Sequence, residues 1–177
     1  MNDHNNAISN NKIAGKIIPA IISVIILVSF DQIAKNIVDN HLSLYDSIDV
    51  IPDILQIYYI RNSGAAWGIL QNMQILFYII TSICLIFLLY TYIKLSINNC
   101  FKILRILIIF LFSGALGNFI DRIRFQYVID FIYFKLINFP VFNIADCYVT
   151  VSVFIILFLF IFIYKEDDFN NIHEAIF

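Results

Sequence analysis

Apolar residues dominate this 177-residue chain, and they gather into four long runs separated by segments that carry most of the polar residues. A helix that crosses a membrane needs about 20 mostly apolar residues, or about 17 at the short end. A buried soluble core would explain one run of this length, but not four. The runs cover about residues 17–34, 73–93, 103–122 and 143–164. The pattern therefore predicts an all-α membrane protein with four transmembrane helices.

The connection between the first two runs, residues 36–72, is the longest of these segments. Its residues 50–60 are rich in β-branched and aromatic side chains, which is typical of a strand that follows a turn. We expect a small β-containing piece here, lying on the membrane surface between transmembrane helices 1 and 2. The connection 123–141 is shorter and aromatic, and aromatic residues at a membrane interface are ordinary anchors.

Composition supports the membrane class and argues against others. Charged residues make up 14% of the chain, whereas soluble domains carry roughly 25%. The net charge of −2, without any run of Lys or Arg, argues against a nucleic-acid partner. The three cysteines have the spacing of neither a disulfide framework nor a zinc site, so we interpret them as small apolar residues.

The chain is expected to form one membrane domain with polar ends. The first run is followed by Asp31-Gln32-Ile33-Ala34-Lys35 rather than by a small-residue cleavage site, so we expect it to remain as a membrane anchor. The domain is predicted to span residues 13–165. A disordered, Asn-rich leader precedes it at 1–12, and a solvated polar tail follows at 166–177.

The unusual polar residues all fall at one end of the predicted helices. Because successive crossings alternate in direction, the ends of runs one and three face the same side as the starts of runs two and four. Both termini face the other side. Lys and Arg divide six to five between the two sides. Once Arg61 and Arg122 are set aside as members of polar clusters, the positive-inside rule places the termini in the cytoplasm.

Two carboxylates, Asp130 and Asp146, stand on either side of one short connection at the membrane edge. An Asp held in or near lipid is a functional-site hypothesis by default, because its ionised form is costly there. Two close carboxylates in a water-poor site share one proton. One can then act as a base on water while the other donates a proton, as in aspartic proteases. The alternative is helix capping, since Asp146 lies in the first turn of run four.

Run three ends in a second polar group. Asn118, Asp121 and Arg122 are spaced i, i+3 and i+4, which places them on one helical face. An Asp beside an Arg favours a structural ion pair for Asp121, whereas the donors of Arg122 suit a substrate carbonyl or a lipid ester. The preceding Gly114-Ala115-Leu116-Gly117 predicts close helix packing.

Two further polar residues, Asn62 and Asp31, lie outside these groups. Asn62, in a Gly-rich turn before run two, is either a substrate contact or part of that turn. Asp31, at the edge of run one, is interpreted as structural, tying down residues 36–72.

Several chemistries find little support. No histidine lies near a second one at ligand spacing, which disfavours a histidine metalloprotease. Carboxylates alone could hold Mg²⁺, which remains an alternative, although we expect no cofactor. A small transporter or proton-coupled channel is the rival class, because its aspartates relay protons. A transport site belongs near the bilayer midplane, however, and these residues gather at one surface.

Five motifs follow one another along the chain. They are Asp31-Gln32-x-x-Lys35, Asn62-x-Gly64-Ala65-Ala66-Trp67-Gly68, Gly114-Ala115-x-Gly117-Asn118-x-x-Asp121-Arg122, Val128-x-Asp130-Phe131 and Phe142-Asn143-x-Ala145-Asp146. Together they resemble the signature of lipoprotein signal peptidase, the bacterial signal peptidase II family, over about residues 14–164. The resemblance implies a four-helix aspartic peptidase. Such an enzyme removes the signal peptide of prolipoproteins before a diacylglyceryl-modified cysteine, at the outer side of the cytoplasmic membrane.

The resemblance also implies roles for single residues and partners. Asp130 and Asp146 correspond to the catalytic pair. The candidates for substrate binding or support of that pair are Asp31, Asn62, Gly64, Asn118, Asp121, Arg122 and Asn143. The cyclic peptide antibiotic globomycin is the expected inhibitor, membrane lipid the expected surroundings, and a monomer the expected state.

Overall fold

The four predicted transmembrane helices are present in the computed structural model, which describes residues 2–64, 73–97 and 101–176. They are α1 (Asn2–His41), α2 (Gln74–Ile97), α3 (Lys102–Phe125) and α4 (Ile144–Phe158), which continues into a π-helical turn, η3 (Leu159–Ile163). Many of their large apolar side chains are exposed on the outside of the bundle, as expected for helices surrounded by lipid. Helix α1 begins at Asn2, within the residues assigned above to the leader.

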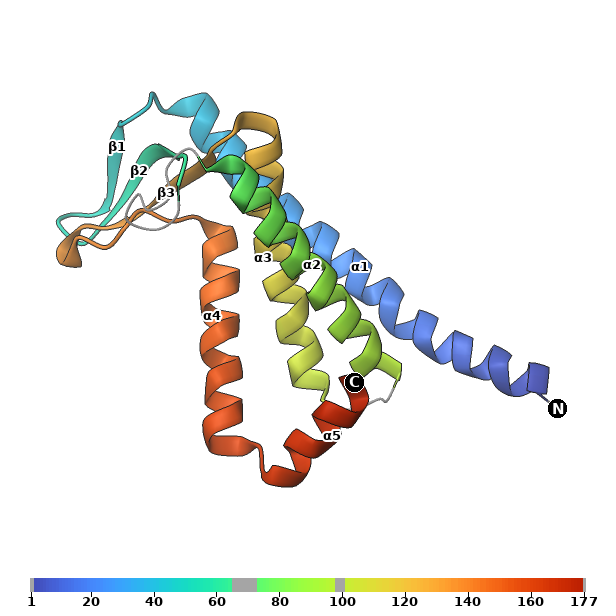
Figure 1. The fold of residues 1–177 in the computed structure, drawn as a ribbon. Helices are drawn as coiled ribbons and strands as arrows, with labels where there is room; N and C mark the ends of the chain where they lie inside the picture. Colours follow the sequence, from blue (N-terminus) through green and yellow to red (C-terminus); the bar gives the residue numbers. More distant parts are fainter. Residues whose placement is uncertain (1, 65–72, 98–100, 177) are drawn as a thin grey trace.

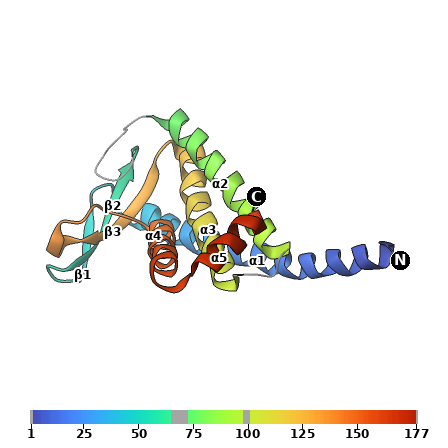
Figure 2. The ribbon, with the colours of Figure 1, turned by 60° about the horizontal axis from the view of Figure 1, so that its bottom comes forward.

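Helix α3 lies at the centre of the bundle and contacts α1, α2 and α4 (Figures 1 and 2). Its glycines allow this close approach. A Cβ atom on Gly114 would lie 2.4 Å from the Ala145 carbonyl oxygen of α4, and one on Gly117 would lie 2.7 Å from Asp31 Oδ2 of α1. The close packing predicted for this small-residue stretch is confirmed.

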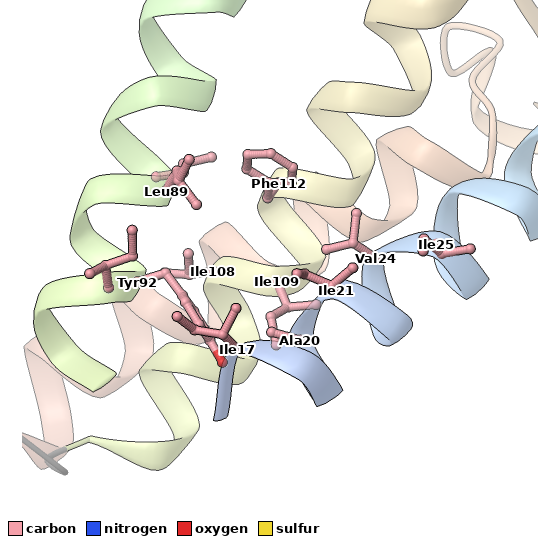
Figure 3. Close-up of a pocket in the computed structure, with 12 residues that line it drawn as sticks. Ile17, Ala20, Ile21, Val24, Ile25, Leu89, Tyr92, Ile108, Ile109 and Phe112 are labelled. Carbon is pink, nitrogen blue, oxygen red and sulfur yellow. The ribbon is translucent and has the colours of Figure 1, made fainter. Parts of the chain in front are cut away.

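An apolar groove of about 320 Å³ lies between α1, α2 and α3, in the half of the bundle away from the sheet (Figure 3). Side chains such as Ile21, Leu89 and Phe112 point into it. Its lining is almost wholly apolar, as expected for a groove that faces lipid.

A three-stranded antiparallel sheet lies at one end of the bundle, in the order β1 (Ser47–Ile51), β2 (Leu55–Asn62), β3 (Val128–Phe134) (Figure 1). Strands β1 and β2 come from the connection predicted to contain β structure. Strand β3 comes from the aromatic connection, for which no strand was predicted, and leads into the short 3₁₀ helix η2 (Lys135–Ile137). Asn62 pairs with Val128 and Ile60 with Asp130, so the end of β2 lies beside the start of β3.

The segment before α4 is tied to β3. Phe142 forms a bridge with Ile132, whose amide donates to the Phe142 carbonyl at 2.8 Å and whose carbonyl accepts from the Phe142 amide at 3.0 Å. This pairing holds the first turn of α4 against the strand that carries Asp130.

A further helix, α5 (Glu166–Ile176), follows α4 and is not among the elements predicted from the sequence. Ile172, Ala175 and Ile176 are buried against Leu95 of α2 and residues of α3. Figure 1 shows α5 and both chain ends at the opposite end of the bundle from the sheet. The alternation of four crossings predicts this common end.

Candidate active site

Asp130 lies on β3, and its side chain is buried, with only 2% of the residue exposed. The Asn62 amide donates to its Oδ2 at 2.9 Å, and the Asn143 amide donates to its Oδ1 at 2.7 Å. Burial raises the pKa of Asp130 to about 7, and the nearby Asp146 carboxylate adds to that shift, while the two amide donors oppose it. Asp130 is therefore able to hold a proton close to neutral pH.

Asp146 lies in the first turn of α4, where it forms a capping box with Asn143. Its Oδ2 accepts from the Asn143 backbone amide at 3.1 Å, and the Asn143 side-chain oxygen accepts from the Asp146 amide at 2.9 Å. The capping alternative is thus correct for this carboxylate. Its other oxygen, Oδ1, accepts from the Asn118 amide at 2.7 Å, and Asp146 lines the same cavity as Asp130.

Both carboxylates line a cavity of about 310 Å³ that combines polar and apolar side chains. The polar lining comes from the ends of β2 and α3 and the starts of β3 and α4. The apolar lining comes largely from the segment that precedes α4. The lining residues are Asn62, Gly64, Asn118, Arg122, Val128, Asp130, Phe139, Pro140, Val141, Phe142, Asp146 and Thr150.

Arg122 reaches this cavity from α3. Its Nη2 donates to the Gly64 carbonyl at 3.2 Å, and its guanidinium carbon lies 4.5 Å from the centre of the Phe77 ring. In the described part of the chain, Arg122 Nε is buried and has no hydrogen-bond acceptor. Arg122 therefore keeps one unpaired donor and lines the same cavity as the two carboxylates.

The ion pair expected for Asp121 is present, but its cation is Lys35 rather than Arg122. Lys35 Nζ lies 2.9 Å from Asp121 Oδ2 and 2.8 Å from Asp31 Oδ2, and all three residues are at most 1% exposed. Asp31 is structural as predicted, with a different partner. Its Oδ1 accepts from the Ala145 amide at 2.9 Å, so it joins α1 to α4 rather than to residues 36–72.

Hydrogen bonds and ion pairs join all of the predicted site residues into one network, with Lys35 as the added member. Lys35 belongs to the first motif but is not among the site residues predicted from the sequence. A cation one helical turn after Asp31, directly after the first apolar run, is the signal that could have identified it. Ala65, Ala66, Trp67 and Gly68 of the second motif lie outside the described residues. The network consists of Asp31, Asn62, Gly64, Asn118, Asp121, Arg122, Asp130, Asn143 and Asp146 around Lys35.

Comparison with known proteins identifies the family. The model for signal peptidase (SPase) II matches residues 23–162. The chain belongs to the signal peptidase II family. The lipoprotein signal peptidase of Streptococcus pyogenes serotype M1 is 39% identical over 151 residues, which cover 85% of this chain and 96% of the relative. That of serotype M5, strain Manfredo, is 38% identical over the same shares of the two chains.

Solved structures agree with this assignment. A bacterial membrane enzyme determined by the in meso method at 2.3 Å resolution is 41% identical, with a TM-score of 0.76 over 84% of this chain and 92% of that one. A second, at 1.9 Å resolution, is 39% identical, with a TM-score of 0.71 over 82% and 94%. The chain is therefore a multi-pass bacterial membrane peptidase, and the transporter alternative is set aside.

The described residues contain no group of three or more His, Cys, Asp or Glu side chains placed to hold a metal ion. The groups that face Asp130 and Asp146 are instead N–H donors from three asparagines, Asn62, Asn118 and Asn143. Such donors orient carboxylates and stabilise their charge.

Proposed function

We propose that this peptidase removes the signal peptide of diacylglyceryl-modified prolipoproteins, cutting before the lipidated cysteine with a water activated by Asp130 and Asp146. One observation carries the proposal: Asn143 bonds to both carboxyl groups, through its side chain to Asp130 and through its backbone to Asp146. Both carboxyl groups line one cavity at the end of a membrane bundle. Two acids held in this way can divide the roles of base and proton donor.

The two acids differ in their hydrogen-bond donors and in their place relative to a helix end. Asp130 is buried, and its raised pKa lets it carry the shared proton near neutral pH. Asp146 accepts N–H bonds from Asn118 and Asn143 at the positive end of α4, which suits an anion. We assign Asp146 as the base and Asp130 as the acid in the resting enzyme.

The reaction then proceeds through a tetrahedral intermediate. Asp146 takes a proton from the water as its oxygen attacks the carbonyl carbon of the scissile bond, while Asp130 donates its proton to the carbonyl oxygen. The intermediate collapses when the proton held by Asp146 passes to the leaving amine and the hydroxyl proton returns to Asp130. The carbon–nitrogen bond breaks, and the dyad again holds one proton.

The remaining groups serve substrate binding. The available Nε donor of Arg122 supports a contact with a substrate carbonyl oxygen. The apolar signal helix docks against the transmembrane helices, while the diacylglyceryl chains stay in lipid. We further propose that the enzyme is a monomer, that its termini are cytoplasmic and that its cavity opens at the outer face of the cytoplasmic membrane.

A reconstituted cleavage assay tests this function. Purified protein in lipid vesicles receives a precursor carrying a diacylglyceryl-modified cysteine, and the matched control is the same precursor without the lipid. We expect one cut before the modified cysteine, little cleavage of the control, inhibition by globomycin and no effect of EDTA. Cleavage that EDTA abolishes would favour the Mg²⁺ alternative. No cleavage of the lipidated precursor would contradict the proposal.

A further inference from the structure

Lys35 is a buried cation whose hydrogen-bonding capacity is fully used. A lysine ammonium has three N–H donors and no acceptor. In this site Nζ lies 2.8 Å from Asp31 Oδ2, 2.9 Å from Asp121 Oδ2 and 2.9 Å from Asn118 Oδ1. Two of these contacts are with carboxylates of helices α1 and α3. The third is with a neutral amide, and that amide is the one that bonds to Asp146.

The contact with Lys35 fixes which way the Asn118 amide faces. Its oxygen accepts from Lys35 Nζ and from Asn143 Nδ2, at 2.9 and 3.0 Å, while its nitrogen donates to Asp146 Oδ1 at 2.7 Å. Rotating the amide by half a turn would place its NH₂ group against an ammonium ion and its oxygen against a carboxylate. Both contacts would be repulsive, so the ammonium allows one orientation.

The same amide oxygen also helps to orient the second carboxylate. Asn143 Nδ2, which donates to Asn118 Oδ1, also donates to Asp130 Oδ1 at 2.7 Å. One ammonium ion therefore acts through one amide on the donors that face both acids. Lys35 itself is not among the residues that line the cavity.

We propose that Lys35 is a positioning residue for the hydrolysis: it holds the Asn118 amide in the orientation that directs N–H donors at Asp146 and, through Asn143, at Asp130. This inference rests on the proposed function, because it assigns Lys35 a part in the same reaction. A purely structural lysine, which only neutralises Asp31 and Asp121 and joins α1 to α3, is the alternative.

A double-mutant cycle separates the two roles. Lys35→Met, Asn118→Ala and the double variant are compared with the parent protein for folding, kcat and KM on the lipidated precursor. If Lys35 acts through Asn118, Lys35→Met alone lowers kcat by about 100-fold and leaves KM within about threefold of the parent value. In the Asn118→Ala background, the same change lowers kcat by less than about threefold. Lys135→Met is the matched control, because it removes a lysine whose ion pair with Asp53 is exposed.

Loss of Lys35 leaves two facing carboxylates buried, which could prevent folding. In that case the whole cycle is repeated with Asp31→Asn in every member. Lys35→Met then leaves only one buried carboxylate, Asp121, without its cation. Equal kcat losses from Lys35→Met with and without Asn118 would overturn the inference, as would a folded Lys35→Met variant with the parent's kcat. If the parent protein does not cleave, the proposed function fails and takes this inference with it. If the parent cleaves but the kcat losses of Lys35→Met and Asn118→Ala multiply in the double variant, only the inference about Lys35 fails.

Discussion

Asn143 takes part in two arrangements at once. Its side-chain oxygen caps α4 by accepting from the Asp146 amide, and its side-chain nitrogen donates to Asp130. The residue is fully buried, and a buried amide is tolerated when its donors and acceptors are paired. The residue that fixes the start of the helix therefore also sets the position of one acid relative to the other. For Asp146, helix capping and a place in the active site are compatible.

The raised pKa of Asp130 predicts how Asp130→Asn changes stability with pH. In the folded protein this carboxyl keeps its proton up to about pH 7, whereas in the unfolded chain it ionises near its ordinary value of 3.8. As pH rises between these values, the unfolded chain loses a proton that the folded protein retains, so the parent protein loses stability. Asparagine does not titrate and escapes this loss.

Thermal unfolding in detergent at pH 4.5 and pH 7.5 measures the effect. We expect the Tm of Asp130→Asn minus the Tm of the parent to be at least ~5 °C larger at pH 7.5 than at pH 4.5. A Tm difference that is the same at both pH values would contradict the assignment of the buried proton to Asp130.

At the scale of elements, the four transmembrane helices follow from run length alone, because lipid offers the backbone no hydrogen-bond partners and favours helices. Strand β3 does not follow in this way. Its sequence, Val-Ile-Asp-Phe-Ile-Tyr-Phe, is consistent with an interfacial aromatic segment, and pairing with the distant β2 makes it a strand. The local sequence pattern does not show which distant segment a strand will pair with.

Helix α5 was missed for a related reason. Its residues are polar on average, but Ile172, Ala175 and Ile176 recur at helical spacing and pack on α2 and α3. The grouping of the candidate site residues could be anticipated, because apart from Gly64 each is a polar side chain at or near the end of an apolar run. The partner of Asp121 could not be predicted, since a sequence does not show which neighbouring helix supplies the cation. The partner of Asp31 was open to prediction, because Lys35 follows it by one turn of the same helix.

Close packing of α3 against α1 predicts a specific effect for Gly117→Ala. The new Cβ would lie 2.7 Å from Asp31 Oδ2 and 3.3 Å from Ala145 Cβ. We expect a loss of about 1–3 kcal/mol in stability, together with slower cleavage, because Asp31 holds Lys35 in place.

The matched control is Gly15→Ala, where nothing lies within 4 Å of the added methyl group. Alanine is a better helix former than glycine, so this change should raise stability by up to about 1 kcal/mol. Thermal unfolding and the cleavage assay on both variants check the prediction. Equal behaviour of the two alanine variants would show that the α1–α3 contact is looser than described.

At the scale of the whole molecule, the sheet lies at one end of the bundle, whereas α5 and the chain ends lie at the other (Figure 1). The polar network lies at the sheet end, because its residues belong to the ends of α1, β2 and α3 and the starts of β3 and α4. The sheet end itself exposes large apolar side chains, including Ile48, Ile54, Leu136 and Ile137. These residues suit a sheet that rests on the membrane surface above the bundle.

The proposed orientation predicts the accessibility of engineered cysteines. With the native cysteines replaced, a single cysteine at exposed Asp53, before β2, should react in intact cells with a maleimide that does not cross membranes. A single cysteine at exposed Asn170, in α5, should react only after permeabilisation. The reverse pattern would place the sheet and the cavity in the cytoplasm.

The account depends on two acids that share one proton and act as a unit. Single-turnover cleavage of the lipidated precursor by Asp130→Asn, Asp146→Asn and the double variant, each shown to be folded in the membrane, tests this most directly. We expect each single change to lower the rate by at least ~1,000-fold and the double change to cost no more than either alone. A single variant that keeps a tenth of the parent rate, or losses that multiply in the double variant, would contradict the account.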